Sequence, residues 1–476
     1  MKILMVTTES APFVKTGGLG EVVYSLSAGL KKKTADVTIV LPLYSEIKTL
    51  VKKQSVPLFE YQVPLSWRMQ YAGVYRLEQD EMTFYFIDNE YYFGRGGIYG
   101  YFDDGERFAF YSLAIKELIL RLNMPFDIIH VHDYPCGMLL PLIREDRDAD
   151  YLFSNTKLVM TIHNPSFQGR YPPQVLSDLY NLSEALSHKF YINGTISTLI
   201  AGIEYADLIT TVSPNHREEL LSVAGSFGLS SILNRKQDCF VGILNGIDYQ
   251  RFSPLHDEYL PFNYHLKNMD LKKQELKKRL LERFNLAPLD RPVFAMVSRL
   301  SQQKGLDFAF ASIDALLDNG FYVIMMGSGQ KEYEEYAEYL RNKHYDHCGI
   351  YLGYHDELAH LIYAGSDFFL MPSLFEPCGI GQMIAAHYGT LPIVRETGGL
   401  KDSIIKYDGT NADRATGYSF FEPSAAAFFN TCSYALTTYY GDYETHLKLM
   451  KNAFKYDFSS VTTATLYYRQ YLKLLK

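Results

Sequence analysis

SLFEPCGIGQ, residues 373–382, joins an apolar run at Phe368–Met371 to the segment Met383–Ala386. The apolar run is typical of a buried parallel strand, and the later segment indicates the start of a helix. In an open α/β sheet, ligands bind at the carboxyl ends of strands, against helix N-termini. The stretch therefore predicts a doubly wound α/β sheet in which Glu376 and free backbone N–H groups face a ligand. Such a pairing suits a substrate with hydroxyls at one end and phosphates at the other.

Length and composition restrict the class of protein. A chain of 476 residues is too long for one ordinary core, so we expect two domains of about 200 residues each. Hydrophobic residues make up 47% and charged residues 21%, which is normal for a soluble globular protein. The formal net charge of −8 argues against a nucleic-acid partner, because no broad basic field would neutralise phosphates.

The cysteines and the N-terminal segment predict a cytoplasmic protein with no membrane partner. Five cysteines are scattered, odd in number and without a CxxC pair, so they form neither a disulfide framework nor a zinc pattern. The strand-like Met1–Val6 runs into polar residues and does not resemble a signal peptide. No apolar run is long enough for a transmembrane helix.

The first part of the chain reads as the start of a parallel sheet. A buried strand at 2–8, a glycine-bearing loop at Lys15–Gly20 and a helix are followed by a strand at Val37–Leu41, which predicts a βαβ unit. The loop is not GxGxxG, so the dinucleotide fingerprint fails. Residues 58–88 alternate polar and apolar side chains and predict antiparallel strands inserted into the parallel frame.

Three later strands each end on polar residues. Asp127–His132 precedes Asp133, Lys157–Ile162 precedes His163, and Leu208–Val212 precedes a serine. The carboxyl ends of parallel strands share one edge of the sheet, so we expect Asp133 and His163 to face one cleft. A lone histidine at a strand end is more often a structural residue, but two such residues together favour a functional site.

The domain boundary is placed near 247–255. Domain one covers 1–247, and domain two covers 255–460 and opens like the first, with a strand at Val293–Ser298, a basic loop and a helix. Residues 461–476 predict a terminal helix. The pattern leaves open whether this helix packs on the second domain or returns to the first.

Two loops carry candidate anion-binding residues. Gly17 and Gly18 lack a Cβ, so a ligand could approach the backbone closely, and Lys15 could reach its charge; the alternative is an ordinary βα turn. Arg299 and Lys304 flank the first loop of the second domain and suit a diphosphate; the alternative is surface charge that aids solubility.

Glu376 could hold sugar hydroxyls or stabilise a positively charged transition state. The alternative is a carboxylate favoured at a helix N-terminus by the helix dipole. Cys378 alone is more often a small buried hydrophobe than a nucleophile. No spacing of His, Cys and Asp resembles a closed metal site, so no metal is predicted.

Ordered motifs along the whole chain resemble those of bacterial glycogen synthases and plant starch synthases. They are the segments at 15–20, 132–134, 161–164, 211–214, 242–248, 297–305, 373–379, 388–390 and 397–400. The resemblance implies a GT-B fold, with two Rossmann-like domains and the active site in the cleft between them. It implies transfer of glucose from ADP-glucose to the non-reducing end of an α-1,4-glucan such as glycogen, with retention of configuration and no cofactor.

The resemblance also implies roles for single residues. Lys15, Gly17 and Gly18 would lie near the donor phosphates, and Arg299 and Lys304 would neutralise the departing diphosphate. By the same resemblance, Glu376 would hold the glucose hydroxyls, with help from the backbone amides of Cys378, Gly379 and Gly381. His163 would lie beside the glucose, and Asp133 would shape the sugar and acceptor pocket. Tyr354 would stack on adenine, and Asn245 would line the cleft.

Four positions depart from the family pattern: Glu21, Ile200, Gly381 and His387. They leave two other hypotheses open. One is a related transferase that uses another nucleotide sugar or acceptor. The other is a catalytically weak paralogue that binds glucan.

Overall fold

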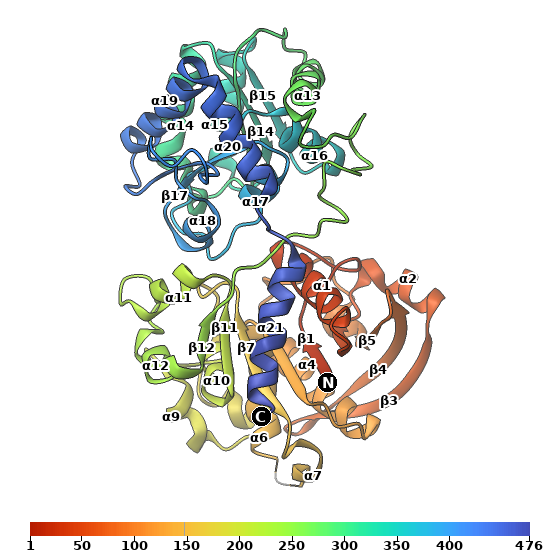
Figure 1. Cartoon of the computed structure of the whole chain (residues 1–476). Coiled ribbons are helices and arrows are strands. Elements are labelled where there is room, and N and C mark those ends of the chain that lie inside the picture. The colour runs from red at the N-terminus through yellow and green to blue at the C-terminus, as the bar shows by residue number, and fades with distance from the viewer. Residues whose placement is uncertain (147) are drawn as a thin grey trace. The chain divides into compact units, whose positions relative to one another are not determined.

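The computed structural model describes residues 1–146 and 148–476 and divides them into two compact units (Figure 1). The first comprises Met1–Asn245 with Ser460–Lys476, and the second comprises Gly246–Ser459. Each unit is built on its own largely parallel sheet. The linking residues near 247–255 belong to the second unit.

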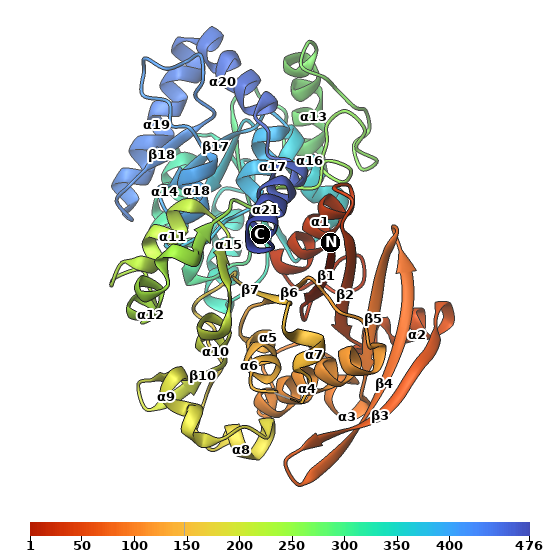
Figure 2. The same cartoon turned by 60° about the horizontal axis from the view of Figure 1, so that its bottom comes forward.

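The sheet of the first unit has the strand order β12-β11-β7-β6-β1-β2-β5-β4-β3. The inserted antiparallel strands were predicted correctly: β4 pairs antiparallel with β3 and β5, while β5 continues the parallel sheet beside β2 (Figure 2). The strands are β1 (Lys2–Val6), β2 (Asp36–Pro42), β3 (Val56–Leu65), β4 (Arg68–Gln79), β5 (Met82–Asp88), β6 (Ile128–His132), β7 (Lys157–Ile162), β11 (Leu208–Thr211) and β12 (Phe240–Gly242). A small separate sheet holds β8 (Arg170–Tyr171), β10 (Thr195–Ser197) and β9 (Tyr191–Ile192).

Helices cover the central strands of this sheet, which are buried on both faces. Residues 3–6 of β1 are all buried, as expected for a parallel strand between helical layers. Burying one large apolar side chain contributes about 1.5–3 kcal/mol, which makes such runs a strong determinant of the fold. The helices are α1 (Gly18–Lys31), α2 (Ser45–Gln54), α3 (Glu90–Phe93), α4 (Asp104–Leu122), α5 (Tyr134–Gly137), α6 (Leu139–Arg144), α7 (Asp150–Phe153), α8 (Val175–Tyr180), α9 (Ser187–Phe190), α10 (Thr198–Tyr205), α11 (Pro214–Leu221) and α12 (Ser230–Arg235), with 3-10 turns at Glu184–Leu186 and Gln237–Cys239.

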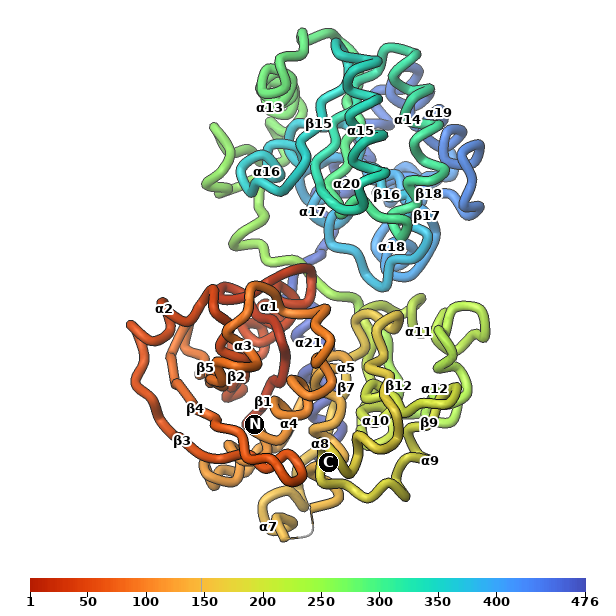
Figure 3. The backbone as a smooth tube through the Cα atoms, turned by 180° about the vertical axis from the view of Figure 1, so that it is seen from behind, coloured from red at the N-terminus to blue at the C-terminus, as the bar shows by residue number. Residues whose placement is uncertain are grey.

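The terminal helix α21 (Ser460–Leu474) returns to the first unit, so both chain termini lie there (Figure 3). It packs against α1 so closely that a Cβ on Gly29 would lie 2.5 Å from the Cβ of Ala464. Tyr467 and Tyr471 of α21 are buried against β6 and its neighbours. This packing answers the question that the sequence pattern left open.

The second unit has a six-stranded parallel sheet with the order β15-β14-β13-β16-β17-β18. Its strands are β13 (Val293–Val297), β14 (Tyr322–Gly327), β15 (Cys348–Leu352), β16 (Phe368–Met371), β17 (Leu391–Arg395) and β18 (Tyr418–Phe420). Its helices are α13 (Met269–Arg283), η3 (Gln302–Lys304), α14 (Leu306–Asp318), α15 (Lys331–Lys343), α16 (Asp356–Gly365), α17 (Gly381–His387), α18 (Gly398–Ser403), α19 (Ala425–Gly441) and α20 (Tyr443–Lys455). The strand at Phe368–Met371 and the helix after residue 380 occur where the sequence predicted them.

The first strand is shorter than the predicted 2–8. It ends at Val6 because the polar residues that follow form local hydrogen bonds instead of extending the ladder. Thr7 Oγ1 donates to the carbonyl of Glu9 at 2.9 Å, for example.

Candidate active site

The first unit brings Asp133 and His163 together at one edge of its sheet. Strands β6 and β7 are neighbours in parallel register, so the residues that follow them meet at their carboxyl ends. The backbone N–H of His163 donates to Asp133 Oδ1 at 2.7 Å, and that of Asn164 donates to the same oxygen at 3.3 Å. The carboxylate therefore fixes the backbone on which His163 is mounted.

Asp133 has a strained backbone. Its φ of 58° with ψ of −179° is a conformation that normally requires glycine and costs on the order of 1–3 kcal/mol in another residue. The surrounding structure holds it there, with its N–H donating to the Thr161 carbonyl at 3.0 Å. Burial raises the pKa of its carboxyl to about 7, against the opposing effect of the two backbone N–H groups. Strain and a perturbed acid at the same position are typical of functional sites.

The imidazole of His163 is held by a second histidine. His163 Nε2 lies 3.0 Å from Nδ1 of His132, whose ring packs 4.2 Å from that of His130. Burial lowers the pKa of His163 to about 3, so its ring is neutral at pH 7. Sequence reasoning missed His132, although the alternation of His130 and His132 in β6 was visible.

The glycine-bearing loop leaves open space beside its backbone. A Cβ added at Gly17 or Gly18 would meet no heavy atom within 4 Å, so internal packing does not require glycine at either position. Lys15 Nζ forms an ion pair with Glu21 at 2.9 Å, and both side chains are partly exposed. The structure thus places a cation and unobstructed backbone at the N-terminal end of α1.

Buried Glu9 anchors this loop, which the sequence analysis did not anticipate. It is 3% exposed and accepts hydrogen bonds from the backbone N–H of Thr16 at 2.5 Å and from Thr16 Oγ1 at 3.0 Å. The hydroxyl of Tyr99 also donates to Glu9, at 2.8 Å. The sequence indicated this anchoring role only by placing an acid in the polar stretch after β1.

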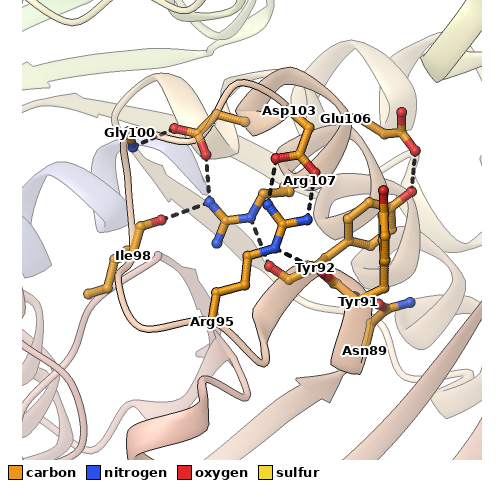
Figure 4. Close-up of polar contacts among 10 residues, drawn as sticks. Asn89, Tyr91, Tyr92, Arg95, Ile98, Gly100, Asp103, Glu106 and Arg107 are labelled. Atoms are coloured by element: carbon orange, nitrogen blue, oxygen red, sulfur yellow. Dashed lines mark hydrogen bonds and ion pairs between the residues drawn. The ribbon is translucent and has the colours of Figure 1, made fainter.

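The loop that carries Tyr99, residues 94–103, is clamped by two arginines (Figure 4). Arg95 forms a two-pronged ion pair with Asp103, with N–O distances of 2.5 and 2.6 Å. The fully buried Arg107 donates to the carbonyls of Tyr92 at 2.8 Å and Ile98 at 3.0 Å. Arg107 also pairs with Asp104 at 2.5 Å. This clamp holds the loop in place, and with it the Tyr99 hydroxyl that donates to the Glu9 carboxylate.

In the second unit, Lys304 and Glu376 form an ion pair with little solvent exposure. Lys304 Nζ lies 2.6 Å from Glu376 Oε2, and the two side chains are 13% and 11% exposed. Ser373 Oγ donates to the same carboxylate oxygen at 3.0 Å. The predicted cation and the predicted carboxylate are therefore direct partners.

Gly305 allows the basic loop to dock onto the segment after β16. Its φ is +70°, and a Cβ there would lie 2.1 Å from the carbonyl oxygen of Pro372. The backbone N–H of Leu374 donates to the Gln303 carbonyl at 2.8 Å and closes the contact. The side chain of Arg299, at the other end of the loop, is exposed and has no ion pair within residues 1–146 and 148–476.

The turn at 376–381 is shaped by glycines on two loops. The backbone N–H of Gly399 donates to the Glu376 carbonyl at 3.1 Å, and a Cβ on Gly398 would lie 2.0 Å from that oxygen. Gly379 has a φ of +71°, which favours glycine. Gln382 Nε2 donates to the carbonyls of Cys378 and Gly379 at 3.2 and 3.0 Å. These contacts fix the backbone on which Glu376 is mounted.

Tyr354 and Asn245 have different environments. Tyr354 follows β15, is 58% exposed and donates its hydroxyl to Asp356 at 3.0 Å. Asn245 ends the main segment of the first unit, is buried, and donates its backbone N–H to the Val212 carbonyl at 3.3 Å. Its Oδ1 is buried and accepts no hydrogen bond from the described residues.

The four departures from the family pattern each have a structural setting. Glu21 pairs with Lys15, and Ile200, a residue of α10, is buried in the apolar core of the first unit. A Cβ on Gly381 would lie 3.2 Å from the ring of Phe369, so a larger residue would have to displace that ring. His387 stacks on Tyr249, with ring centres 4.0 Å apart and planes 5° apart.

Asp314, Asp318 and His344 are grouped closely enough to hold a metal ion. The ammonium of Lys343 already pairs with both carboxylates, with Nζ 2.8 Å from Asp314 and 3.5 Å from Asp318. All five cysteines are free thiols.

Within the described residues, no helix is long and apolar enough to cross a membrane.

Known proteins match the chain over its whole length. Residues 2–235 match the family described as starch synthase catalytic domain, and residues 277–456 match glycosyl transferases group 1. The glycogen synthase of Bacillus cereus (strain B4264) is 40% identical over 100% of both chains. The chain belongs to the glycogen and starch synthase family. The glycogen synthase of Exiguobacterium sibiricum is 41% identical over 99% of this chain and 98% of its own length.

Solved structures support the same family and its fold. The catalytic domain of starch synthase IV from Arabidopsis thaliana, bound to ADP and acarbose, superposes with a TM-score of 0.91 at 29% identity, covering 99% of each chain. Sucrose-phosphate synthase from Thermosynechococcus elongatus has a TM-score of 0.63 at 16% identity, covering 99% of this chain and 98% of its own, and so shows the fold alone. This glycogen synthase family member has the GT-B fold and is a glycosyltransferase, as the motifs predicted.

Proposed function

We propose that the chain transfers glucose from ADP-glucose to the non-reducing end of an α-1,4-glucan such as glycogen, with retention of the α configuration. Its membership of the glycogen and starch synthase family supports the reaction class. The ADP in the related starch synthase IV structure supports an adenine nucleotide as donor. The observation that carries the proposal is the partly buried pair of Lys304 and Glu376, a cation of the kind that binds phosphate beside a carboxylate of the kind that accepts hydrogen bonds from sugar hydroxyls.

The second unit would bind the donor. Lys304 and the exposed Arg299 would neutralise the departing diphosphate, with the guanidinium as a fork and the ammonium as a point charge. Glu376 would accept hydrogen bonds from glucose hydroxyls, aided by amides of the turn at 378–381. The exposed ring of Tyr354 would stack on adenine.

The first unit would act on the glucose and on the acceptor. Lys15, with the open backbone of Gly17 and Gly18, would approach the phosphates. His163 would lie beside the glucose, with its carbonyl oxygen directed at developing positive charge. Asp133 would shape the sugar and acceptor pocket, and Asn245 would offer its unpaired Oδ1 to a polar group of the ligand.

Catalysis would come from charge neutralisation and positioning. A retaining transfer without a carboxylate nucleophile can proceed by attack on the same face from which the nucleotide leaves. The positive side chains would stabilise the leaving group, where one such group is typically worth about 10²–10³ in rate. We propose that these cations make a metal cofactor unnecessary. Turnover that survives exhaustive chelation would agree with this, and turnover that returns only on adding a divalent ion would contradict it.

Incubation with ADP-[14C]glucose and glycogen tests the function directly. We expect labelled chains that β-amylase degrades and one ADP released for each glucose added. Equal or better use of UDP-glucose would replace the donor assignment while keeping the reaction class. Glycogen binding without ADP release would indicate the catalytically weak paralogue.

A further inference from the structure

His132 is a fully buried side chain that makes a hydrogen-bond contact with another histidine, His163 of the proposed site. Its Nδ1 lies 3.0 Å from Nε2 of His163, and its Nε2 has no hydrogen-bond partner in the described parts of the chain. A contact at this distance between two ring nitrogens requires one proton between them. Either His132 or His163 therefore donates this proton to the other ring.

Both rings are neutral, so each carries a single proton. Burial lowers the pKa of His163 to about 3 and that of His132 well below its ordinary value. If His132 carried its proton on Nε2, that N–H would be a buried donor without an acceptor, which is rare in folded proteins. A proton on Nδ1 leaves only a lone pair at the unpartnered nitrogen, which costs less.

We infer that His132 is a positioning residue whose Nδ1–H donates to Nε2 of His163 and thereby fixes the proton of His163 on Nδ1. The tautomer of a neutral imidazole is set by the hydrogen bond that its other nitrogen makes. With Nε2 occupied as an acceptor, His163 presents an N–H donor at Nδ1. No described residue bonds to that nitrogen.

The donor at Nδ1 suits a hydroxyl oxygen of the bound sugar. This step rests on the proposed function, which puts the glucose beside His163. The opposite tautomer would present a lone pair and would bind the same oxygen only if the hydroxyl turned its own proton inward. His132 thus decides the polarity of the contact without touching the ligand.

A hydrogen-bond network fixes the ring of His130, which packs against the ring of His132 with ring centres 4.2 Å apart. Nε2 of His130 lies 2.5 Å from Thr161 Oγ1, and its Nδ1 lies 2.7 Å from the hydroxyl of Tyr471. Thr161 continues the network to Thr210 Oγ1 at 2.6 Å. Since both nitrogens of His130 are engaged, it cannot compete for the proton of His132.

The test combines a spectroscopic and a kinetic measurement on the full chain. In long-range 1H–15N spectra of protein labelled with 15N-histidine, we expect His163, assigned by its loss in H163Q, to be protonated on Nδ1. His132→Phe keeps the ring volume but removes the donor, and should shift His163 toward the Nε2–H tautomer and lower turnover at least about tenfold. His132→Asn places an amide near Nδ1 and should keep both the tautomer and most of the turnover.

His216→Phe is the matched control. His216 is also buried in the first unit, with Nδ1 2.7 Å from a threonine hydroxyl and Nε2 unpartnered, but it does not contact His163. We expect it to leave the tautomer unchanged and turnover within twofold. A wild-type His163 protonated on Nε2 would overturn the inference even if the donor were not ADP-glucose, and so would near-normal turnover in H132F. A wild-type Nδ1–H tautomer without ADP-glucose transfer would contradict only the proposed function.

Discussion

Neutralising Lys304 and Glu376, singly and together, separates their effect on stability from their effect on catalysis. At a separation of 2.6 Å and an effective dielectric constant of about 20, the direct attraction is about 6 kcal/mol, most of which the loss of hydration offsets. Exposed pairs contribute about 0–1 kcal/mol, and breaking a fully buried pair costs about 3–5 kcal/mol. With exposures of 13% and 11%, we expect each single neutral variant to lose about 2–3 kcal/mol of unfolding free energy.

Lys304→Met should lie at the lower end of that range, because Ser373 still donates to the carboxylate that is left behind. The double variant K304M/E376Q removes both charges and should recover to within about 1 kcal/mol of the wild type. Its turnover should stay low, because a cation that stabilises a leaving group is typically worth about 10²–10³ in rate.

Urea unfolding followed by circular dichroism measures the stabilities, and initial rates of glucose incorporation into glycogen measure turnover. Since the chain has two units, the transition of the second unit has to be analysed separately. Turnover near the wild-type rate in Lys304→Met would refute its role at the leaving group. Single variants with unchanged stability would refute the argument from the buried pair.

Three further predictions concern other residues of the two units. Asp133→Asn should keep the fold and lose most activity. Because the folded acid retains its proton up to a pKa of about 7, the stability of the wild type relative to the Asn variant should fall as the pH rises from about 4 to about 7, and circular dichroism melts of the two proteins at each pH measure that difference. Gly305→Ala should lower the free energy of unfolding by at least about 1–2 kcal/mol from its left-handed backbone alone, and it should displace Lys304. Gly441→Ala is the control, because a Cβ there meets no atom within 4 Å, and it should leave the stability unchanged in the same melts. Equal effects of the two substitutions would contradict the docking of the basic loop onto the segment after β16. Arg107→Met should leave two carbonyls unpaired and remove the ion-pair partner of Asp104, which should cost about 3 kcal/mol and expose residues 94–103 to limited proteolysis. An unchanged cleavage pattern would mean that Arg107 does not clamp this loop.

Sequence alone predicted those parts of the protein that depend on local pattern. Buried parallel strands read as continuous apolar runs, so β7 and β16 were located with their correct ends. Polar residues directly after such strands must lie at one edge of the sheet, which predicted the neighbourhood of Asp133 and His163. The ordered motifs predicted the family and, with it, the GT-B fold.

The shortest strands could not be predicted from the alternation of polar and apolar side chains. The strands β8, β9 and β10 have two or three residues each, too few for a period of two to be recognised. Their positions follow from packing against the helices and loops around them.

Only the tertiary structure decided which side chains pair across long separations. Lys304 and Glu376 are 72 positions apart, and Tyr471 reaches His130 over 341 positions, yet each pair is in hydrogen-bond contact. No local pattern encodes such partners, because they depend on strand order and on the return of α21 to the first unit. The same holds for His132, whose tautomer-setting contact exists only because β6 lies beside β7. The sequence predicted which residues form the candidate site, and packing determined which groups hold those residues in place.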